Sequence, residues 1–293
     1  MNSSGLITIG LPIALAIIMF GLGLTLTVGD FRRVAREPKA VVIALILQVV
    51  VLPAVAFGLV KAFGLDPLLA VGVMLLAASP GGTTANLFSH LFRGDVALNI
   101  TLTAINSVLA VVTIPVITNF AIAYFDADGE VGLQFGKVMQ VVAIVLIPVV
   151  IGMLVRRYSE AFAARADRPV RIFSIVVLVL VAVGALLSER DNVAEYARQV
   201  GLVTGLFCLA SLGLGFAGAR LLKLGQPQAI ATSMEVGIHN TTVALTIAIS
   251  VLGSTEVAIP SAVYSILMYV LATAFGYFVT RRTPTNVTPV RVS

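Results

Sequence analysis

The sequence has 293 residues, of which 59% are hydrophobic and 11% are charged, and its formal net charge is +5. A soluble globular domain carries about 25% charged residues and cannot hide this much apolar surface from water. The composition therefore excludes a soluble or a disordered protein. The positive charge does not indicate nucleic acid, because the basic residues punctuate apolar stretches instead of forming one basic face.

Nine apolar stretches predict an all-α polytopic membrane protein, since a transmembrane helix needs roughly 20 mostly apolar residues. The first stretch is interpreted as a retained span rather than a signal peptide, because it lacks a positive N-terminal region and a small-residue cleavage site. Cys208 lies inside an apolar run and is expected to be a small core residue. The expected spans are 5–28, 39–63, 67–92, 95–124, 133–155, 170–187, 196–222, 228–253 and 258–280.

The basic residues favour one orientation of these spans. With the N-terminus outside and the C-terminus in the cytoplasm, fifteen basic residues fall on the cytoplasmic side and four on the other. This asymmetry is the one that the positive-inside rule predicts, and we expect a multi-pass protein of the inner (plasma) membrane. The cytoplasmic set is Arg32, Arg33, Arg36, Lys39, Arg93, Arg156, Arg157, Arg165, Arg168, Arg171, Arg220, Lys223, Arg281, Arg282 and Arg291; the opposite set is Lys61, Lys137, Arg190 and Arg198.

The spacing of the spans indicates an internal repeat. Spans 1 to 4 and spans 6 to 9 begin at an offset of about 160 residues throughout, and span 5 is left as a connector. Because five spans separate corresponding elements, the second unit is inverted relative to the first. Inverted repeats recur in secondary transporters, where exchanging the conformations of the two halves gives outward-open and inward-open states.

The third and eighth spans, which correspond in this repeat, are interrupted. Pro80 removes a backbone donor and Gly81 and Gly82 are poor helix formers, so a break is expected at 79–86. A second break is expected at 235–242. Polar residues cluster at both places: Thr83, Thr84 and Asn86 in span 3, and Glu235, His239, Asn240, Thr241 and Thr242 in span 8.

Paired breaks at the midplane predict a transport site. The N-terminus of a half-helix attracts an anion, and the carbonyl groups at a half-helix C-terminus coordinate a cation. Thr83, Asn240 and Thr241 would form the polar lips of a site suited to a carboxylate. The alternative is that the first break is only a kink and the second a patch of interhelical hydrogen bonds.

Glu235 is the only acidic residue well inside a predicted span, and a carboxylate there marks an ion or proton pathway. Its alternative role is that of a protonated structural residue. His239 lies four residues further, but a break between the two leaves their geometry open. Asn99 and Thr103 lie one turn apart in span 4. Gln48 and Asn106, taken alone, are expected to make hydrogen bonds between helices.

Three segments, read in order, resemble the bile acid:sodium symporter family. They are IIMFGLGLTLTVGDF, SPGGTTANLFSHLFRGDVALNITLTAINSV and EVGIHNT. The resemblance covers nearly the whole chain and implies nine helices, as in the mammalian members. It also implies a core domain, here 39–124 and 196–281, in which the two discontinuous helices cross. The panel domain would be 5–28, 133–155 and 170–187, with substrate binding between the two domains.

The family resemblance implies two sodium sites. In the first, Asn86, Thr103 and Glu235 match the family, whereas Asn99 stands in place of a serine and Ala85 in place of a hydroxyl residue. In the second, the family's glutamine is replaced by a histidine, and the full set is Gln48, Glu235, Val236, Ile238 and His239, with Val236 and Ile238 contributing backbone oxygens.

The histidine alters the second site, since sodium is a hard cation that prefers oxygen and imidazole nitrogen suits transition metals. Two outcomes stay open: one sodium ion per cycle, or a proton on the Glu235–His239 pair in place of the second ion. A desolvated carboxyl group retains its proton more readily, which makes the second outcome physically reasonable.

The predicted function is a sodium-coupled symporter of small organic anions, with pantoate-like and bile-acid-like carboxylates as the candidates that the resemblance implies. The substrate-binding residues would be Thr83, Thr84, His239, Asn240 and Thr241. Membrane lipid and the substrate are the expected partners, with no obligate protein partner. An intramembrane enzyme is the main rival, but only one acid lies at that depth. A receptor and a channel are further alternatives.

Overall fold

The computed structural model describes residues 11–27, 29, 36–127, 135–188 and 193–281. Every regular element in these ranges is a helix, which confirms the all-α prediction. The elements are α2 (Leu11–Thr25), α4 (Pro38–Ile46), η2 (Leu47–Val51), α5 (Leu52–Phe63), α6 (Pro67–Ala78), α7 (Thr83–Leu91), α8 (Val96–Tyr124), α9 (Phe135–Tyr158), α10 (Glu160–Ser188), α11 (Val193–Leu221), α12 (Gln226–Gly237), α13 (Thr241–Thr246), η3 (Ile247–Leu252) and α14 (Thr255–Arg281).

Four helical stretches of the described chain are long and apolar enough to cross a membrane: Pro38–Phe63, Val96–Tyr124, Val200–Leu221 and Thr255–Arg281. Three shorter apolar helices are Pro12–Thr25, Pro67–Ala78 and Thr241–Leu252. A helix or a pair of helices occupies each expected span, while the count of nine crossings and the inverted repeat stay predictions. Cys208 is fully buried on α11, as expected of a core residue.

One helix begins earlier than the sequence pattern predicted. The sixth span was expected at 170–187, but α10 starts at Glu160 and is continuous over 29 residues, with Pro169 inside it. The added segment contains four alanines, the residue with the highest helix propensity. This part of α10 was not predicted, because the expected span was located by apolar length alone and the segment contains arginines.

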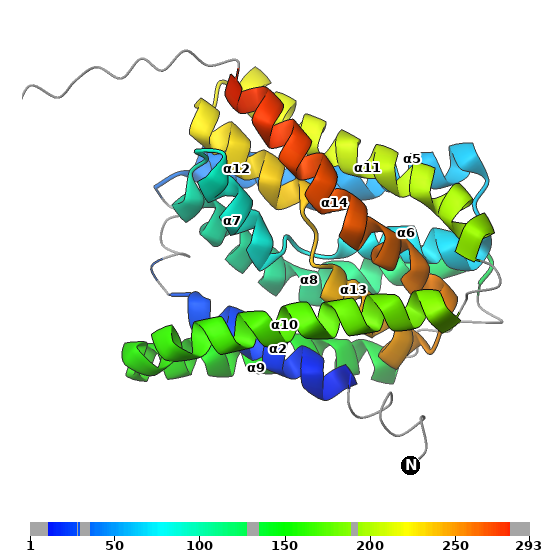
Figure 1. The fold of residues 1–293 in the computed structure, drawn as a ribbon, viewed down its shortest axis with the longest axis horizontal. Helices are drawn as coiled ribbons and strands as arrows, with labels where there is room; N and C mark the ends of the chain where they lie inside the picture. Colours follow the sequence, from blue (N-terminus) through cyan, green and yellow to red (C-terminus); the bar gives the residue numbers. More distant parts are fainter. Residues whose placement is uncertain (1–10, 28, 30–35, 128–134, 189–192, 282–293) are drawn as a thin grey trace, which may run out of the picture.

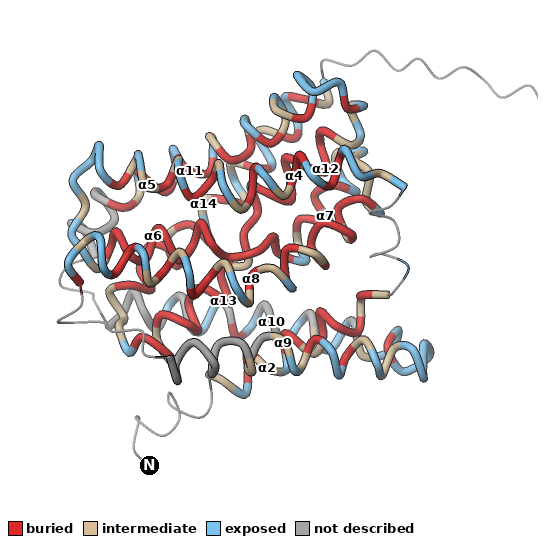
Figure 2. The backbone as a smooth tube through the Cα atoms, turned by 180° about the vertical axis from the view of Figure 1, so that it is seen from behind, coloured by how far each residue is buried: buried red, intermediate tan, exposed pale blue. Residues whose placement is uncertain are grey.

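The helices form two groups in space. α2, α9 and α10 lie together along one side of the molecule (Figure 1). The other group contains the two helix pairs α6–α7 and α12–α13, with α11 packed on α12 and on α14, and α14 packed on α6. Buried residues concentrate in this second group: Figure 2 shows α6 and α12 as almost continuously buried. Contacts between the groups join α13 and α14 to α10.

Candidate functional site

The two predicted interruptions exist, and each is shorter than expected. α6 ends at Ala78 and α7 begins at Thr83, while α12 ends at Gly237 and α13 begins at Thr241. The non-helical backbone is therefore 79–82 and 238–240, rather than 79–86 and 235–242. The breaks are shorter because the polar residues at their edges are themselves helical. Thr83, Thr84 and Asn86 thus form the first turn of α7, and Glu235 lies in the last turn of α12.

The two breaks pair with each other. Gly81 and His239 form an antiparallel β-bridge. The Gly82 N–H donates to the Ile238 carbonyl oxygen at 2.8 Å, and the Asn240 N–H donates to the Pro80 carbonyl oxygen at 2.8 Å. The chain thus runs in opposite directions through the two breaks, and each satisfies backbone groups that the other leaves without a helical partner. The pairing brings the ends of the four half-helices α6, α7, α12 and α13 together at one point of the fold, which we call the crossing.

Glu235 lies beside this crossing and is completely buried. Its Oε2 accepts a hydrogen bond from Thr103 Oγ1 at 2.6 Å, and its Oε1 accepts one from Asn106 Nδ2 at 2.9 Å. The other break comes so close that a Cβ atom on Gly81 would lie 2.2 Å from Glu235 Oε1. A glycine is therefore required where the first break passes the carboxylate of α12.

Two of the residues expected at the first sodium site, Asn99 and Thr103, lie on α8, and Thr103 joins them to Glu235. Asn99 is fully buried, and its Nδ2 donates to Ser89 Oγ at 2.8 Å and to the Ala231 carbonyl oxygen at 2.9 Å. These bonds tie α8 to α7 and α12. Thr103 Oγ1, one turn further, lies 3.0 Å from the Asn99 carbonyl oxygen and 2.6 Å from Glu235 Oε2, so these two acceptors share its single proton. Asn86 brings a buried Oδ1 atom that has no hydrogen-bond partner among the described residues.

Two of the residues expected at the second sodium site, Gln48 and His239, meet at the Ser79 carbonyl oxygen, directly after the end of α6. Gln48 lies on the π-helical turn η2, and its Nε2 donates to this oxygen at 3.0 Å. His239 Nδ1 lies 3.1 Å from the same oxygen. Within the described chain, Gln48 Oε1 is left buried without a partner. The hydrogen bond expected of Gln48 between helices is thus confirmed.

The surroundings of His239 settle its tautomer. A carbonyl oxygen only accepts hydrogen bonds, so Nδ1 must carry the proton that points at Ser79. The ring stacks on Phe207 with centroids 5.5 Å apart, and Tyr264 meets it edge-on at 5.5 Å. Nε2 is buried and unpartnered among the described residues. Because Glu235 bonds instead to α8, the spacing of four residues does not join the two side chains in one hydrogen-bond pair.

Sequence reasoning missed two contributors to the crossing. Asn106 was expected to bond another helix, which is confirmed, but its partner is Glu235 itself. The Tyr264 hydroxyl on α14 donates to the Gly237 carbonyl oxygen at 2.9 Å and so completes the C-terminus of α12. Tyr264 is one of three tyrosines on α14, and no motif in the sequence distinguishes it from the other two.

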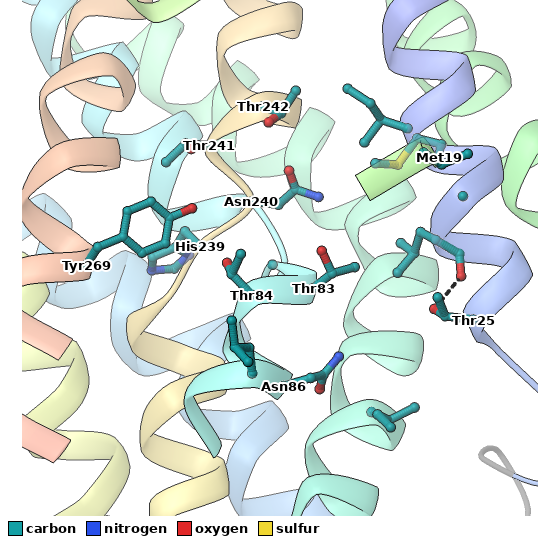
Figure 3. Close-up of a pocket in the computed structure, with 17 residues that line it drawn as sticks. Met19, Thr25, Thr83, Thr84, Asn86, His239, Asn240, Thr241, Thr242 and Tyr269 are labelled. Carbon is teal, nitrogen blue, oxygen red and sulfur yellow. Dashed lines mark hydrogen bonds between the residues drawn. The ribbon is translucent and has the colours of Figure 1, made fainter. Parts of the chain in front are cut away.

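A cavity of about 380 Å³ opens beside the crossing, between the breaks and α2. One wall is polar and contains all five residues expected to bind substrate: Thr83, Thr84, His239, Asn240 and Thr241. Figure 3 shows Met19 and Thr25 on the opposite wall and Tyr269 at the side of α14. The wall from α2 is mainly apolar, with Ile18 and Leu22 beside Met19. These residues were not predicted, because nothing in the first span distinguishes its cavity face.

Comparison with known proteins identifies a family and several relatives of this chain. Residues 12–196 match the Sodium Bile acid symporter family. An "uncharacterized sodium-dependent transporter", YocS of Bacillus subtilis, is 32% identical over 87% of this chain and 78% of its own length. The "probable sodium/metabolite cotransporter" BASS1 of Arabidopsis thaliana is 29% identical, over 93% and 67% respectively. The ileal sodium/bile acid cotransporter of Oryctolagus cuniculus is 28% identical, over 81% and 68%.

These relatives are named as transporters or cotransporters, so the chain is a transporter and not an enzyme. The family match and the apolar helices together make it a multi-pass membrane protein, and the family that it matches is one of sodium-dependent transporters. The paired breaks, the buried carboxylate and the cavity lie in the helices that carry the resembling segments. The chain belongs to the sodium bile acid symporter family.

Proposed function

We propose that the protein is a sodium-coupled symporter that carries a small organic anion by alternating access. The observation that carries this proposal is the antiparallel pairing of the two breaks beside a fully buried Glu235. A buried carboxylate needs a cation or a proton to offset its charge, and it lies next to a cavity that is large enough for a small molecule. Ion and substrate binding are thereby coupled through one crossing point.

Sodium is one of the two cargoes in this proposal. Hard cations take oxygen ligands, and buried oxygens are available on Asn86 and Gln48, one from each expected site. The first site would use Asn86, Asn99, Thr103 and Glu235, whose oxygens come from α7, α8 and α12. The second would use Gln48, Glu235, the backbone of Val236 and Ile238, and the position of His239.

The second site is the weaker one. His239 offers an unpartnered nitrogen where an amide would offer oxygen. Its Nδ1–H is already committed to Ser79, so the Nε2 nitrogen is the only ring atom left to face a cation, and an imidazole has no oxygen to offer. We therefore propose one sodium ion per cycle, and the separate partners of Glu235 and His239 argue against a proton shared between them.

The second cargo is an organic anion with one polar and one apolar end. Hydroxyl and amide groups at the first turns of α7 and α13 suit a carboxylate, and the methionine and aliphatic wall of α2 suits a hydrocarbon body. Pantoate-like and bile-acid-like carboxylates share this design. In this proposal α2, α9 and α10 act as the panel domain and the remaining helices as the core.

The experiment is a thermal-shift screen of purified protein against a panel of monocarboxylates in sodium, potassium or choline. A ligand stabilises only a folded state that it binds, so the correct anion should raise the melting temperature in sodium alone. Glu235→Gln should lose this sodium dependence. Stabilisation of equal size in potassium would contradict sodium coupling, and the absence of any stabilising carboxylate would contradict the proposed substrate class.

Stoichiometry is tested by sodium-dependent uptake into proteoliposomes. The Hill coefficient for sodium should be near one for the natural protein and should rise in His239→Gln, which restores an amide oxygen. A coefficient near two in the natural protein would contradict the one-sodium proposal. Uptake that follows an imposed proton gradient without sodium would favour the proton-coupled alternative instead.

A further inference from the structure

The last turn of α9 and the first three turns of α10 carry a charge pattern that the transport site does not use. Residues 156–171 contain five arginines, Arg156, Arg157, Arg165, Arg168 and Arg171, against Glu160 and Asp167. α10 has 29 residues, so at 1.5 Å per residue it is about 43 Å long, whereas the hydrocarbon core is about 30 Å thick. A helix of this length reaches beyond the hydrocarbon core, and the arginines indicate that its N-terminal end is the part that does so.

One face of α10 is apolar along its C-terminal half and basic along its N-terminal half. Ile172, Val176, Val179 and Val183 are exposed and follow one another at intervals of three or four residues, which places them on a single face. Continuing this face towards the N-terminus leads to Arg168 and then to Arg165, both exposed. In a membrane protein, an exposed apolar stripe of this kind faces lipid tails.

The two guanidinium groups therefore follow the lipid-facing stripe directly. Arg168 precedes Ile172 by four residues, about 6 Å along the axis, and Arg165 precedes it by seven, about 10 Å. Phe162, one turn earlier, is half exposed, as expected of an aromatic side chain at the membrane interface. The Nε atom of Arg165 donates to the Ala161 carbonyl oxygen of its own helix at 3.2 Å, which directs the side chain back along α10.

We propose that this face of α10, centred on Arg165 and Arg168, binds the headgroups of anionic phospholipids. A guanidinium group matches a phosphodiester in charge and in its paired N–H donors. Each basic residue at an anionic surface contributes about 1 kcal/mol, which corresponds to roughly fivefold local enrichment of the anionic lipid. The bound lipid would hold α10, a wall of the cavity through Val170, at a fixed depth in the membrane.

The protein contains no tryptophan, so a single introduced one reports on this segment alone. The full-length Phe162→Trp protein would be reconstituted in neutral bilayers that contain a minor fraction of lipid brominated in the upper acyl chain. The brominated lipid would carry either an anionic phosphatidylglycerol or a neutral phosphatidylcholine headgroup. At equal mole fraction, the anionic probe should quench the tryptophan several-fold more strongly, and high salt should remove the difference.

Substitutions then assign the effect to the two arginines. Arg168→Gln should reduce the preference for the anionic probe by roughly fivefold at most. The Arg165→Lys/Arg168→Lys protein, which keeps both charges, should retain most of the preference. Arg198→Gln, at an exposed position on α11, is the matched control and should leave it unchanged.

Equal quenching by the two probes would overturn the proposal, as would an equal loss of preference in Arg198→Gln. Quenching by neither probe would show that the segment lies outside the interface and would overturn it as well. Tyr158→Trp, at a strongly exposed position just before α10, provides a second reporter if Phe162→Trp does not fold.

Discussion

Gly81 has the least room of the residues at the crossing. A Cβ atom there would lie 2.2 Å and 2.5 Å from the two carboxylate oxygens of Glu235 and 2.3 Å from Cδ. Gly81→Ala must therefore displace the carboxylate or open the paired breaks, and overpacking of this kind costs about 1–3 kcal/mol. We expect this variant to lose sodium-dependent stabilisation and sodium-driven uptake, and to melt at a lower temperature.

The control is Gly58→Ala on α5, where an added Cβ meets no atom within 4 Å. It should keep sodium-dependent uptake and melt no lower than the natural protein. If Gly81→Ala binds sodium with unchanged affinity, Glu235 does not occupy the position on which the first sodium site depends.

At the residue scale, the sequence identifies what is chemically unusual but not what it touches. Glu235 stands out because a carboxylate is rare in an apolar span, and Pro80 because it breaks a helix. The roles of Asn106 and Tyr264 could not be predicted, because a polar side chain on a helix acquires its partner only through packing. Asn106 is 129 residues from Glu235. The family resemblance implied that the two discontinuous helices cross, but the backbone hydrogen bonds between the breaks could not be predicted, since they join two distant segments.

At the element scale, α2 and α9 are packed closely through glycines. A Cβ on Gly23 would lie 2.2 Å from the Val149 carbonyl oxygen, and one on Gly152 would lie 2.3 Å from the Phe20 carbonyl oxygen. Small residues at such contacts let the backbones of membrane helices approach closely. Arg156, at the end of α9, adds a hydrogen bond of 2.8 Å to the Leu24 carbonyl oxygen. The two helices therefore form one closely packed unit.

Gly152→Ala should separate these helices and lower the melting temperature of the purified protein. Gly201→Ala on α11 is a matched control, because its Cβ meets nothing within 4 Å. Both substitutions raise the helix propensity by about 1 kcal/mol. The difference in melting temperature between the two variants therefore reports on the contact between α2 and α9 alone. If Gly152→Ala melts at the same temperature as Gly201→Ala, or higher, the close approach of α2 and α9 is not needed for stability.

Helices were predictable where apolar length alone defines them, and the expected spans coincide with described helices within a few residues at most ends. The exception is the start of α10, where an arginine-rich, alanine-rich helix follows α9 after one residue. Apolar length cannot detect a helix that leaves the hydrocarbon core. Helix propensity would have extended it to Glu160, but charge in the same segment argued for a loop.

At the scale of the whole molecule, the cavity lies towards one end. Thr25 ends α2, Leu87 lies beyond the first turn of α7, and Ile100 is in the second turn of α8. These positions lie towards the basic connections that the positive-inside rule assigns to the cytoplasm. Towards the other end, α13 packs against α2 and α10, and η3 packs against α9. The sequence predicts that a carrier closes one side at a time, but not which side the fold leaves open.

This asymmetry predicts an inward-facing resting state, which thiol labelling in membrane vesicles can test. Leu87 is exposed on α7 and lines the cavity, whereas the natural Cys208 is fully buried, so Leu87→Cys adds a single accessible thiol. A membrane-impermeant maleimide should label it in inside-out vesicles and leave it unlabelled in right-side-out vesicles. Phe63→Cys, exposed at the end of α5 on the opposite side, should show the reverse pattern and so verify the orientation.

Labelling of Leu87→Cys from the outside, with Phe63→Cys also labelled there, would mean that the cavity opens outward. A reversed pattern at both positions would instead mean that the predicted orientation is wrong while the asymmetry of the cavity holds.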